Sequence, residues 1–302
     1  MKKIFAIIIV SIFLFSAQHC RAFSFAVFGD TQSFKGSKSE LGKSVKSLRK
    51  SKNADFLMTL GDMCSGRKCV KNLPKWKKVV NPLNVPIYPT MGNHDLVSLD
   101  FWNSLFSPPQ NGPADFSGIT YSFDFENSHF VVLSTSFYGW HLINAAQRAW
   151  LEEDLTANQK ENVFVFFHAT AFPVGIKINN ALDSNPEERD AFWQILDEHN
   201  VTAVFSGHEH MFERRLIDSS VFPGAQNSIY QFGEGNTDAY SIPKPVQSVE
   251  YYYRSKSYLV VNVDGTQITA NLYKPGGKLL NSFTFSKQTA PEQTFSPPPN
   301  KP

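Results

Sequence analysis

The sequence predicts an α/β fold in which short, buried strands alternate with helices. Short continuous apolar runs end in glycine or a polar residue, and stretches of helical periodicity separate these runs. In addition, 42% of the 302 residues are hydrophobic and 14% are aromatic. This composition provides enough apolar surface for a full core and excludes collagen, coiled coils and a largely disordered chain.

The predicted elements follow one another in a β-then-α order over the first two-thirds of the chain. Apolar runs bounded by turn residues predict strands at residues 23–28, 55–60, 86–91, 162–167 and 201–205. The stretches between them predict helices at residues 41–52, 74–83, 144–155 and 186–199. Continuous apolar runs, rather than alternating ones, are typical of strands that are buried on both faces of a layered fold.

A second pattern interrupts this order and then ends it. Residues 121–125 and 129–134 alternate in hydrophobicity around residues 126–128, which predicts a hairpin. After Gly207 helix signals are few. Runs joined by turn residues predict antiparallel strands at residues 228–232, 257–263, 267–273 and 278–285.

Both ends of the chain differ from the part between them. Residues 1–22 begin with lysines, continue with an apolar run and end in small residues, as a cleavable signal peptide does. The apolar run at residues 4–15 is shorter than the roughly 20 residues that span a bilayer, so no stable membrane anchor is expected. An uncleaved anchor is the alternative. Residues 288–302 hold five of the 18 prolines and predict a disordered tail. We therefore expect a secreted or periplasmic protein with one domain at residues 23–287.

Cleavage of the signal peptide changes the sign of the net charge. The whole chain has 29 Lys and Arg against 27 acidic residues, and loss of Lys2, Lys3 and Arg21 leaves 26 against 27, a net charge of −1. No nucleic-acid partner is expected at this charge. Residues 35–78 are nevertheless basic, with 13 Lys and Arg and three acidic residues. This segment either steers an anionic substrate or forms a solvated helix face.

Two cysteines remain after cleavage, Cys64 and Cys69, with four residues between them. In an oxidising compartment such a pair can close a small disulfide. Two free thiols or a site for a soft metal are the alternatives.

Tyr138, Trp140 and His141 lie between a predicted strand and a predicted helix. Their position fits either a substrate-binding loop or ordinary aromatic packing.

Polar side chains stand where five of the apolar runs end. They are Asp30, Asp62, the group Asn93-His94-Asp95, His168, and His208 with His210. In open α/β sheets the carboxyl ends of the strands line the ligand crevice, so these side chains are expected at one site. Glycines that precede several of them allow the backbone to turn sharply and approach closely.

Carboxylates, an amide and imidazoles at one buried place need a counter-charge, because an unpaired charge in a core is costly. Divalent or trivalent metal ions such as Mn, Zn or Fe suit this ligand set, and two ions can share one carboxylate and clamp a phosphate. A single Gly-Asp pair or a single histidine would indicate only a turn or an ordinary polar residue. Five such positions in this order indicate a metal site.

The order of these motifs resembles that of the calcineurin-like metallophosphoesterases, which carry Asp-x-His, Gly-Asp, Gly-Asn-His-Asp/Glu, a lone His and Gly-His-x-His. The resemblance spans about residues 23–210. Segments similar to those of purple acid phosphatases are residues 121–123, 164–168, 207–214 and 233–236. The resemblance implies a four-layer α/β/β/α metallophosphoesterase sandwich.

The resemblance also implies a role for each residue. Asp62 would bridge two metal ions. Asn93, His168 and His208 would complete the ligands of one ion, and Asp30 and His210, with Gln32, those of the other. His94 would contact the phosphate or protonate the leaving oxygen, Asp95 would orient the His94 ring, and a metal-bound hydroxide would be the nucleophile.

Two positions depart from the family pattern. Gln32 stands where the family has a second histidine, and it is either a weaker ligand or a hydrogen-bond partner behind the ligands. Ser65 stands where purple acid phosphatases have a tyrosine, so a purple Fe(III) centre is not expected.

The sequence therefore predicts an exported hydrolase that acts on small phosphomonoesters. A phosphodiesterase or nucleotide hydrolase of the same fold is the first alternative. The second alternative, suggested by Gln32, is a metal-binding or phosphate-binding module that has lost catalysis. The sequence leaves the metal identity and the oligomeric state open.

Overall fold

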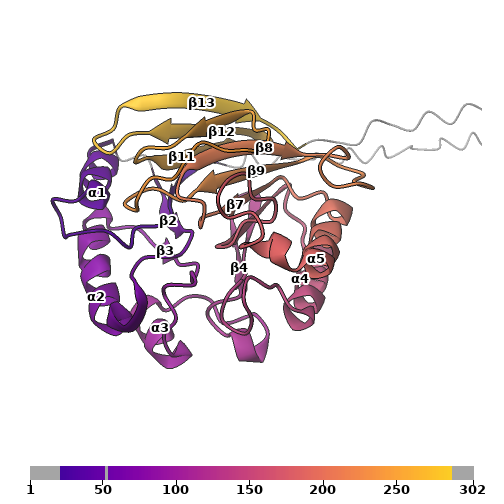
Figure 1. The fold of residues 1–302 in the computed structure, drawn as a ribbon, viewed down its shortest axis with the longest axis horizontal. Helices are drawn as coiled ribbons and strands as arrows, with labels where there is room; N and C mark the ends of the chain where they lie inside the picture. The colour runs from indigo at the N-terminus through magenta and orange to yellow at the C-terminus, as the bar shows by residue number, and fades with distance from the viewer. Residues whose placement is uncertain (1–20, 52–53, 288–302) are drawn as a thin grey trace, which may run out of the picture.

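The computed structural model describes residues 21–51 and 54–287, which fold into four layers (Figure 1). Two β-sheets pack face to face, and helices cover the outer face of each sheet. The layers follow the order α/β/β/α, so the fold expected from the sequence is confirmed.

The first sheet has six strands in the order β13-β12-β11-β1-β2-β3. Its parallel part consists of β1 (Phe23–Phe28), β2 (Phe56–Thr59) and β3 (Ile87–Tyr88). Its antiparallel part consists of β11 (Tyr258–Asp264), β12 (Gln267–Tyr273) and β13 (Leu279–Phe285), with β11 paired to β1.

The second sheet has seven strands in the order β10-β8-β9-β7-β6-β5-β4. Its parallel centre consists of β5 (Ser128–Val132), β6 (Asn162–Phe167), β7 (Ala203–Ser206) and β9 (Ile229–Glu234). Antiparallel strands flank this centre, namely β4 (Tyr121–Phe125), β8 (Phe212–Ile217) and β10 (Tyr251–Tyr253).

Five α-helices in the described residues form the two outer layers. The first sheet is covered by α1 (Glu40–Ser51), α2 (Cys69–Val80) and α3 (Leu99–Phe106), and the second by α4 (Ala145–Ala157) and α5 (Pro186–Glu198). The side chains of Ser98 and Asn144 cap α3 and α4 by accepting from backbone N–H groups of the first turn. Pro186 starts α5, a position where its missing N–H costs nothing.

Phenylalanines fill the space between the two sheets. Phe25 of β1 and Phe56 of β2 stack at a centroid distance of 5.4 Å, and Phe130 of β5 meets both rings edge-on. All three side chains are fully buried. These three rings, one from each of β1, β2 and β5, pack the parallel part of the first sheet against the second sheet.

The structure differs from the sequence prediction in a few elements. β3 has two residues where the sequence predicts residues 86–91. α2 begins at Cys69, whereas the sequence predicts a helix at residues 74–83. Pro74, a residue typical of the first turn of a helix, lies inside α2. The sequence does not predict α3 or β8; in β8 the adjacent charged residues 213–215 mask the strand pattern.

The predicted signal peptide at residues 1–22 lies outside the described residues except for its last two, and the predicted tail at residues 288–302 lies wholly outside them. Both stay predictions. Within residues 21–51 and 54–287, no helix has the length and hydropathy needed to cross a membrane.

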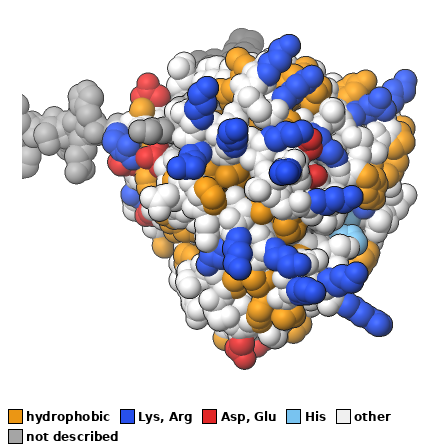
Figure 2. Space-filling model, turned by 90° about the vertical axis from the view of Figure 1, so that its left-hand side faces the viewer, with side chains coloured by type: hydrophobic (Ala, Val, Ile, Leu, Met, Phe, Trp, Pro, Cys, Tyr) orange, Lys and Arg blue, Asp and Glu red, His pale blue; other side chains and the backbone are white. Residues whose placement is uncertain are grey.

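The outer surface on the side of α1 and α2 is strongly basic, as Figure 2 shows. Glu40 pairs with Lys43, and Asp55 pairs with Arg21 in the chain that retains residue 21. Within the described part of residues 35–78, the exposed cations that form no ion pair with a described residue are Lys35, Lys38, Lys46, Arg49, Lys50, Arg67, Lys68, Lys71, Lys75 and Lys78. We call this surface the basic face.

Candidate metal centre

The strand ends that the sequence predicts to meet lie together in the structure. Asp30 and Asp62 follow β1 and β2 of the first sheet, and His168 follows β6 of the second. One ligand atom from each of these three side chains lies within 4.8 Å of the other two. All three side chains are buried. The carboxyl edges of the two sheets therefore form one site.

Hydrogen bonds between the sheets fix the orientation of these side chains. Oδ2 of Asp30 accepts from the backbone N–H of His208 at 2.9 Å. Nδ1 of His168 lies 2.7 Å from the backbone oxygen of Leu60. Because a carbonyl oxygen can only accept, Nδ1 of His168 carries the proton and Nε2 keeps its lone pair.

Two oxygen atoms of the described residues lie near Nε2 of His168. Oδ1 of Asn93 lies 2.9 Å from this nitrogen, and Oδ2 of Asp62 lies 3.5 Å from it. Burial lowers the pKa of His168, so a second proton on the ring is disfavoured. Lone pairs that face one another in a buried place need a cation between them. Asp62, Asn93 and His168 therefore fit a metal ion.

A second group of possible ligands surrounds Asp30. Nε2 of His210 lies 3.2 Å from Oδ1 of Asp30, and this oxygen accepts no hydrogen bond from the described residues. The amide nitrogen of Gln32 lies 3.2 Å from the same nitrogen of His210, and Oε1 of Gln32 is buried without a hydrogen bond. A half-turn of this amide would place Oε1 next to His210. Gln32 is thus brought to the site, while its part in metal binding stays a prediction.

His208 lies beside these residues in a particular orientation. The centroids of the His208 and His168 rings are 5.1 Å apart. Nε2 of His208 donates to the backbone oxygen of Asn180 at 2.7 Å. Nδ1 is therefore the ring nitrogen that remains available for a metal ion.

Burial perturbs the charges of the site in a consistent way. Burial raises the pKa of Asp30 to about 7, and burial together with the Asp30 carboxylate raises the pKa of Asp62 to about 7. Neither carboxylate forms an ion pair with a Lys or Arg among the described residues. Burial also lowers the pKa of His210 to about 4 and that of His208 well below its usual value. Such carboxylates and neutral imidazoles are ligands that a cation would stabilise.

The backbone at the site is strained. Asp30, Asp62 and His208 have positive φ angles of 47°, 52° and 68°, a conformation that costs about 1–3 kcal/mol for residues other than glycine. A Cβ atom on Gly92 would collide with the Asp62 carboxylate, and one on Gly207 would collide with that of Asp30. The prediction that glycines allow a close approach is confirmed at these two positions.

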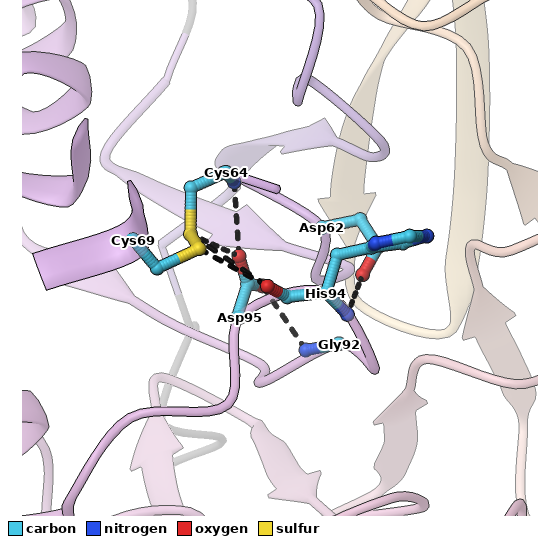
Figure 3. Close-up of a disulfide and its surroundings, with 6 residues drawn as sticks. All are labelled: Asp62, Cys64, Cys69, Gly92, His94 and Asp95. Atoms are coloured by element: carbon cyan, nitrogen blue, oxygen red, sulfur yellow. Dashed lines mark hydrogen bonds and ion pairs between the residues drawn. A yellow bond between two sulfur atoms is a disulfide. The ribbon is translucent and has the colours of Figure 1, made fainter. Parts of the chain in front are cut away.

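His94 lies next to Asp62 (Figure 3). Its backbone N–H donates to Oδ1 of Asp62 at 2.9 Å, and its ring nitrogen Nε2 lies 3.9 Å from Oδ2 of Asp62. The His94 side chain is 45% exposed. Its ring can therefore reach a molecule that enters from solvent.

The structure corrects the role expected for Asp95. Its carboxylate accepts from the backbone N–H of Cys64 at 3.0 Å and from that of Gly92 at 3.1 Å (Figure 3). These contacts point it away from the His94 ring and towards the neighbouring loop. Asp95 therefore holds the turn before His94 to the loop of Cys64 and makes no hydrogen bond to the His94 ring among the described residues.

A disulfide joins Cys64 and Cys69, which confirms the prediction for this pair. Within the loop that it closes, the backbone N–H of Gly66 donates to the backbone oxygen of His94 at 3.2 Å. Two hydrogen bonds therefore join the disulfide loop to the turn that carries His94, one from Gly66 to His94 and one from Cys64 to Asp95. Figure 3 shows the second of them.

Two further residues of the site are not among those that the sequence predicts. The Glu209 carboxylate accepts from the backbone N–H groups of Val174 and Gly175 at 2.8 and 2.7 Å and so fixes the loop that follows β6. After burial, the charge of Lys177 is the next largest cause of the lowered pKa of His210. The place of Glu209 between two histidines is a signal that could have identified it, whereas Lys177 lies in a loop without any motif.

Comparisons with known proteins agree with this geometry. The family described as calcineurin-like phosphoesterase matches residues 23–212. Purple acid phosphatase 23 of Arabidopsis thaliana is 30% identical over 152 residues, which are 46% of this chain and 32% of that protein. Purple acid phosphatase 22 of the same plant is 25% identical over 249 residues, 76% of this chain and 55% of that protein. The chain thus spans about half or less of the length of these relatives.

Solved structures share the fold. Purple acid phosphatase PPD1 from yellow lupin (Lupinus luteus) seeds has a TM-score of 0.69 at 17% identity, with 88% of this chain and 54% of that chain covered. PhoD has a TM-score of 0.66 at 13% identity, with 88% and 70% covered. GAP50, the anchor in the inner membrane complex of Plasmodium, has a TM-score of 0.64 at 13% identity, with 89% and 90% covered.

Proposed function

The chain belongs to the calcineurin-like phosphoesterase family, and from this premise we propose that it is an exported, metal-dependent hydrolase of phosphomonoesters. The observation that carries the proposal is the buried group of oxygen atoms from Asn93 and Asp62 around Nε2 of His168, a ring nitrogen without a proton. The matching curated relatives are purple acid phosphatases, which favours monoesters over diesters.

We assign the metal ligands to two groups that share Asp62. Asn93, His168 and His208 form one group with it, and Asp30 and His210 form the other. The family resemblance assigns the shared position to Asp62, whose Oδ2 lies 3.5 Å from Nε2 of His168 and which belongs to the same close group as Asp30. When bound, two metal ions in such a site supply a nucleophilic water at neutral pH and neutralise charge on the phosphoryl oxygens.

His94 is the proposed acid for the leaving oxygen. Its partly exposed ring is held near Asp62 through its own backbone N–H, so it can follow the substrate without leaving the site. A positioned acid of this kind contributes about 10²–10⁴-fold to a rate. Asp95 supports this role because it holds the turn before His94 to the loop of Cys64.

The basic face supports an anionic substrate. Arg67 and Lys68 lie in the short 3₁₀ turn Gly66–Lys68, whose first residue bonds to the backbone of His94. Exposed cations at the edge of a site raise the local concentration of anions and the association rate. We propose that this surface steers phosphate esters towards His94.

The N-terminal sequence and the disulfide support export. Residues 1–22 have the composition of a signal peptide, and a disulfide between Cys64 and Cys69 is typical of an oxidising compartment. Secreted and periplasmic locations both satisfy these observations.

The test is a comparison of two substrates on the chain that starts at Phe23, loaded with Mn, Zn or Fe. We expect metal-dependent hydrolysis of 4-nitrophenyl phosphate that exceeds hydrolysis of the bis-ester. Asp62→Asn keeps the acceptor for the His94 N–H but removes the charge, and His94→Ala removes the acid. Each should lower kcat by at least about a hundredfold.

One exposed aspartate and one partly buried histidine provide matched controls. Asp115→Asn lies in the short turn Ala114–Phe116, and His199→Ala removes a histidine that pairs with Glu152. Both variants should keep wild-type kcat. A preference for the bis-ester would replace the proposal with a phosphodiesterase. Metal binding without turnover of either ester would instead favour a module that has lost catalysis, the alternative that Gln32 suggests.

A further inference from the structure

Nine large apolar side chains are exposed among the described residues, and five of them lie on loops at the edge of the metal centre. The five are Leu96, Tyr138, Trp140, Ile176 and Tyr240, and we call them the apolar collar. Scattered exposed apolar residues need no explanation, whereas a group of them around one polar site marks a binding surface.

All four loops that carry the collar leave the carboxyl end of a parallel strand. Leu96 follows β3, Tyr138 and Trp140 follow β5, Ile176 follows β6, and Tyr240 follows β9. The metal ligands leave the same ends of neighbouring strands. The collar and the ligands therefore share one edge of the sandwich.

Trp140 reaches the ligands through His141. The Trp140 and His141 rings are 4.3 Å apart, and the His141 and His208 rings are 4.5 Å apart. Trp140 itself remains 58% exposed. Trp140 thus packs on His141, the neighbour of a proposed ligand, and leaves most of its surface to solvent.

Tyr240 occupies the corresponding position at the other histidine of the motif. Its ring meets the His210 ring edge-on at a centroid distance of 4.2 Å, and 59% of the residue is exposed. Tyr240 thus lies directly against His210, and Trp140 lies one ring away from His208, with His141 between them.

Hydrogen bonds from buried or neighbouring side chains hold two of the four loops that carry the collar. The Glu209 carboxylate holds the N–H of Gly175, next to Ile176. The side chain of Asn185 donates to the backbone oxygens of Trp140 and His141. A surface held in this way is pre-organised to bind a ligand, since little conformational freedom is lost on binding.

From these contacts we infer that the apolar collar binds the alcohol part of the substrate, so that the preferred phosphomonoesters carry an aromatic or other apolar group. This inference rests on the proposed function, because it assumes that the phosphate occupies the metal centre. With the phosphate bound at the metal centre, the ester oxygen and the alcohol group attached to it point towards solvent. The exposed aromatic rings of Trp140 and Tyr240 can contact the alcohol group there. Sugar phosphates and glycerol phosphates would leave these rings uncovered.

The experiment compares 2-phenylethyl phosphate with ethyl phosphate on the metal-loaded chain that starts at Phe23. Both esters release a primary alcohol of similar basicity, so a difference in kcat/KM reports on binding of the phenyl group. We expect a preference of about tenfold for the phenyl ester, and Trp140→Ala and Tyr240→Ala should each lower this ratio about threefold or more. Tyr252→Ala, an exposed tyrosine of β10, is the matched control and should keep the wild-type ratio.

Binding of the corresponding phosphonates, measured by calorimetry, provides a readout that does not need turnover. A Kd for 2-phenylethylphosphonate about tenfold below that for ethylphosphonate, lost in Trp140→Ala and Tyr240→Ala, supports the collar even in an inactive protein. Turnover of both esters at equal kcat/KM would overturn the collar but leave the proposed function standing. Equal binding of both phosphonates would also overturn it. So would a change of oligomeric state in these two variants without any change in the ratio, because a second copy of the chain would then be the occupant.

Discussion

Removal of the disulfide between Cys64 and Cys69 should lower both the stability of the fold and the turnover of the proposed reaction. The disulfide closes a loop that bonds to the backbone of His94 through Gly66. On the other side, the N–H of His94 donates to Asp62. A looser loop therefore shifts the proposed acid relative to the metal ligands.

The size of the stability effect follows from the length of the closed loop. Cys64 and Cys69 are five residues apart in the sequence, and the chain-entropy model gives about 2 kcal/mol at 25 °C for such a loop. For a domain of this size that loss lowers Tm by about 4–8 °C. A displacement of the catalytic group by about 1 Å costs up to about a hundredfold in rate, so we expect kcat to fall about tenfold.

The assay uses the variant in which both cysteines are replaced by serine, because thiol reductants would bind the metals. Calorimetric Tm and kcat for 4-nitrophenyl phosphate are compared with those of the wild type. Ser65→Ala, an exposed position in the same loop whose side chain makes no cap hydrogen bond, is the control. A double serine variant with wild-type Tm and wild-type kcat would refute the reasoning.

Three further changes have defined outcomes. Burial raises the pKa of Glu213 to about 8 from an ordinary value of 4.5, so the folded state binds more protons between these values and stability falls as pH rises through that window. Glu213→Gln should therefore raise the free energy of unfolding at pH 8 by at most about 4 kcal/mol, and Tm with it. Near pH 4 both should stay unchanged. If the basic face steers substrate, kcat/KM of the wild type should fall as ionic strength rises. The double variant Lys68→Glu with Lys71→Glu should flatten that dependence, whereas Lys50→Glu, at the far end of α1, should not. A flat wild-type response would remove the steering role. Gln32→His should tighten metal binding on the Asp30 side, as followed by metal titration, and an unchanged Kd would assign Gln32 to a place behind the ligands.

The identity of the site residues could be predicted from the sequence because each one ends a strand. A strand end is a local feature, and parallel strands place their carboxyl ends at one edge whatever the loops do. Asp30, Asp62 and His168 are of this kind, and the structure brings their ligand atoms together.

Contacts made by loops could not be predicted in the same way. The Asp95 carboxylate bonds to Cys64, 31 positions earlier in the chain, and the Glu209 carboxylate bonds to Gly175. Such partners depend on how each loop folds back over the sheet edge, and no periodicity in the sequence encodes the path of a loop. The same reason explains why the sequence could name Trp140 as a residue of a possible binding loop but could not place it beside His208.

The proposed metal ligands also join the two halves of the sandwich, which decides how they should be substituted. Oδ2 of Asp30, from the first sheet, accepts from the backbone of His208, and Nδ1 of His168, from the second, donates to the backbone of Leu60. An alanine at Asp30 would remove a ligand and leave a buried N–H unpaired, a loss of about 1–3 kcal/mol that has nothing to do with chemistry. Asp30→Asn removes the charge that a cation would need and keeps an acceptor for His208. Loss of metal binding in the asparagine variant, with Tm of the metal-free protein maintained, therefore separates the role of Asp30 as a ligand from its role in joining the sheets.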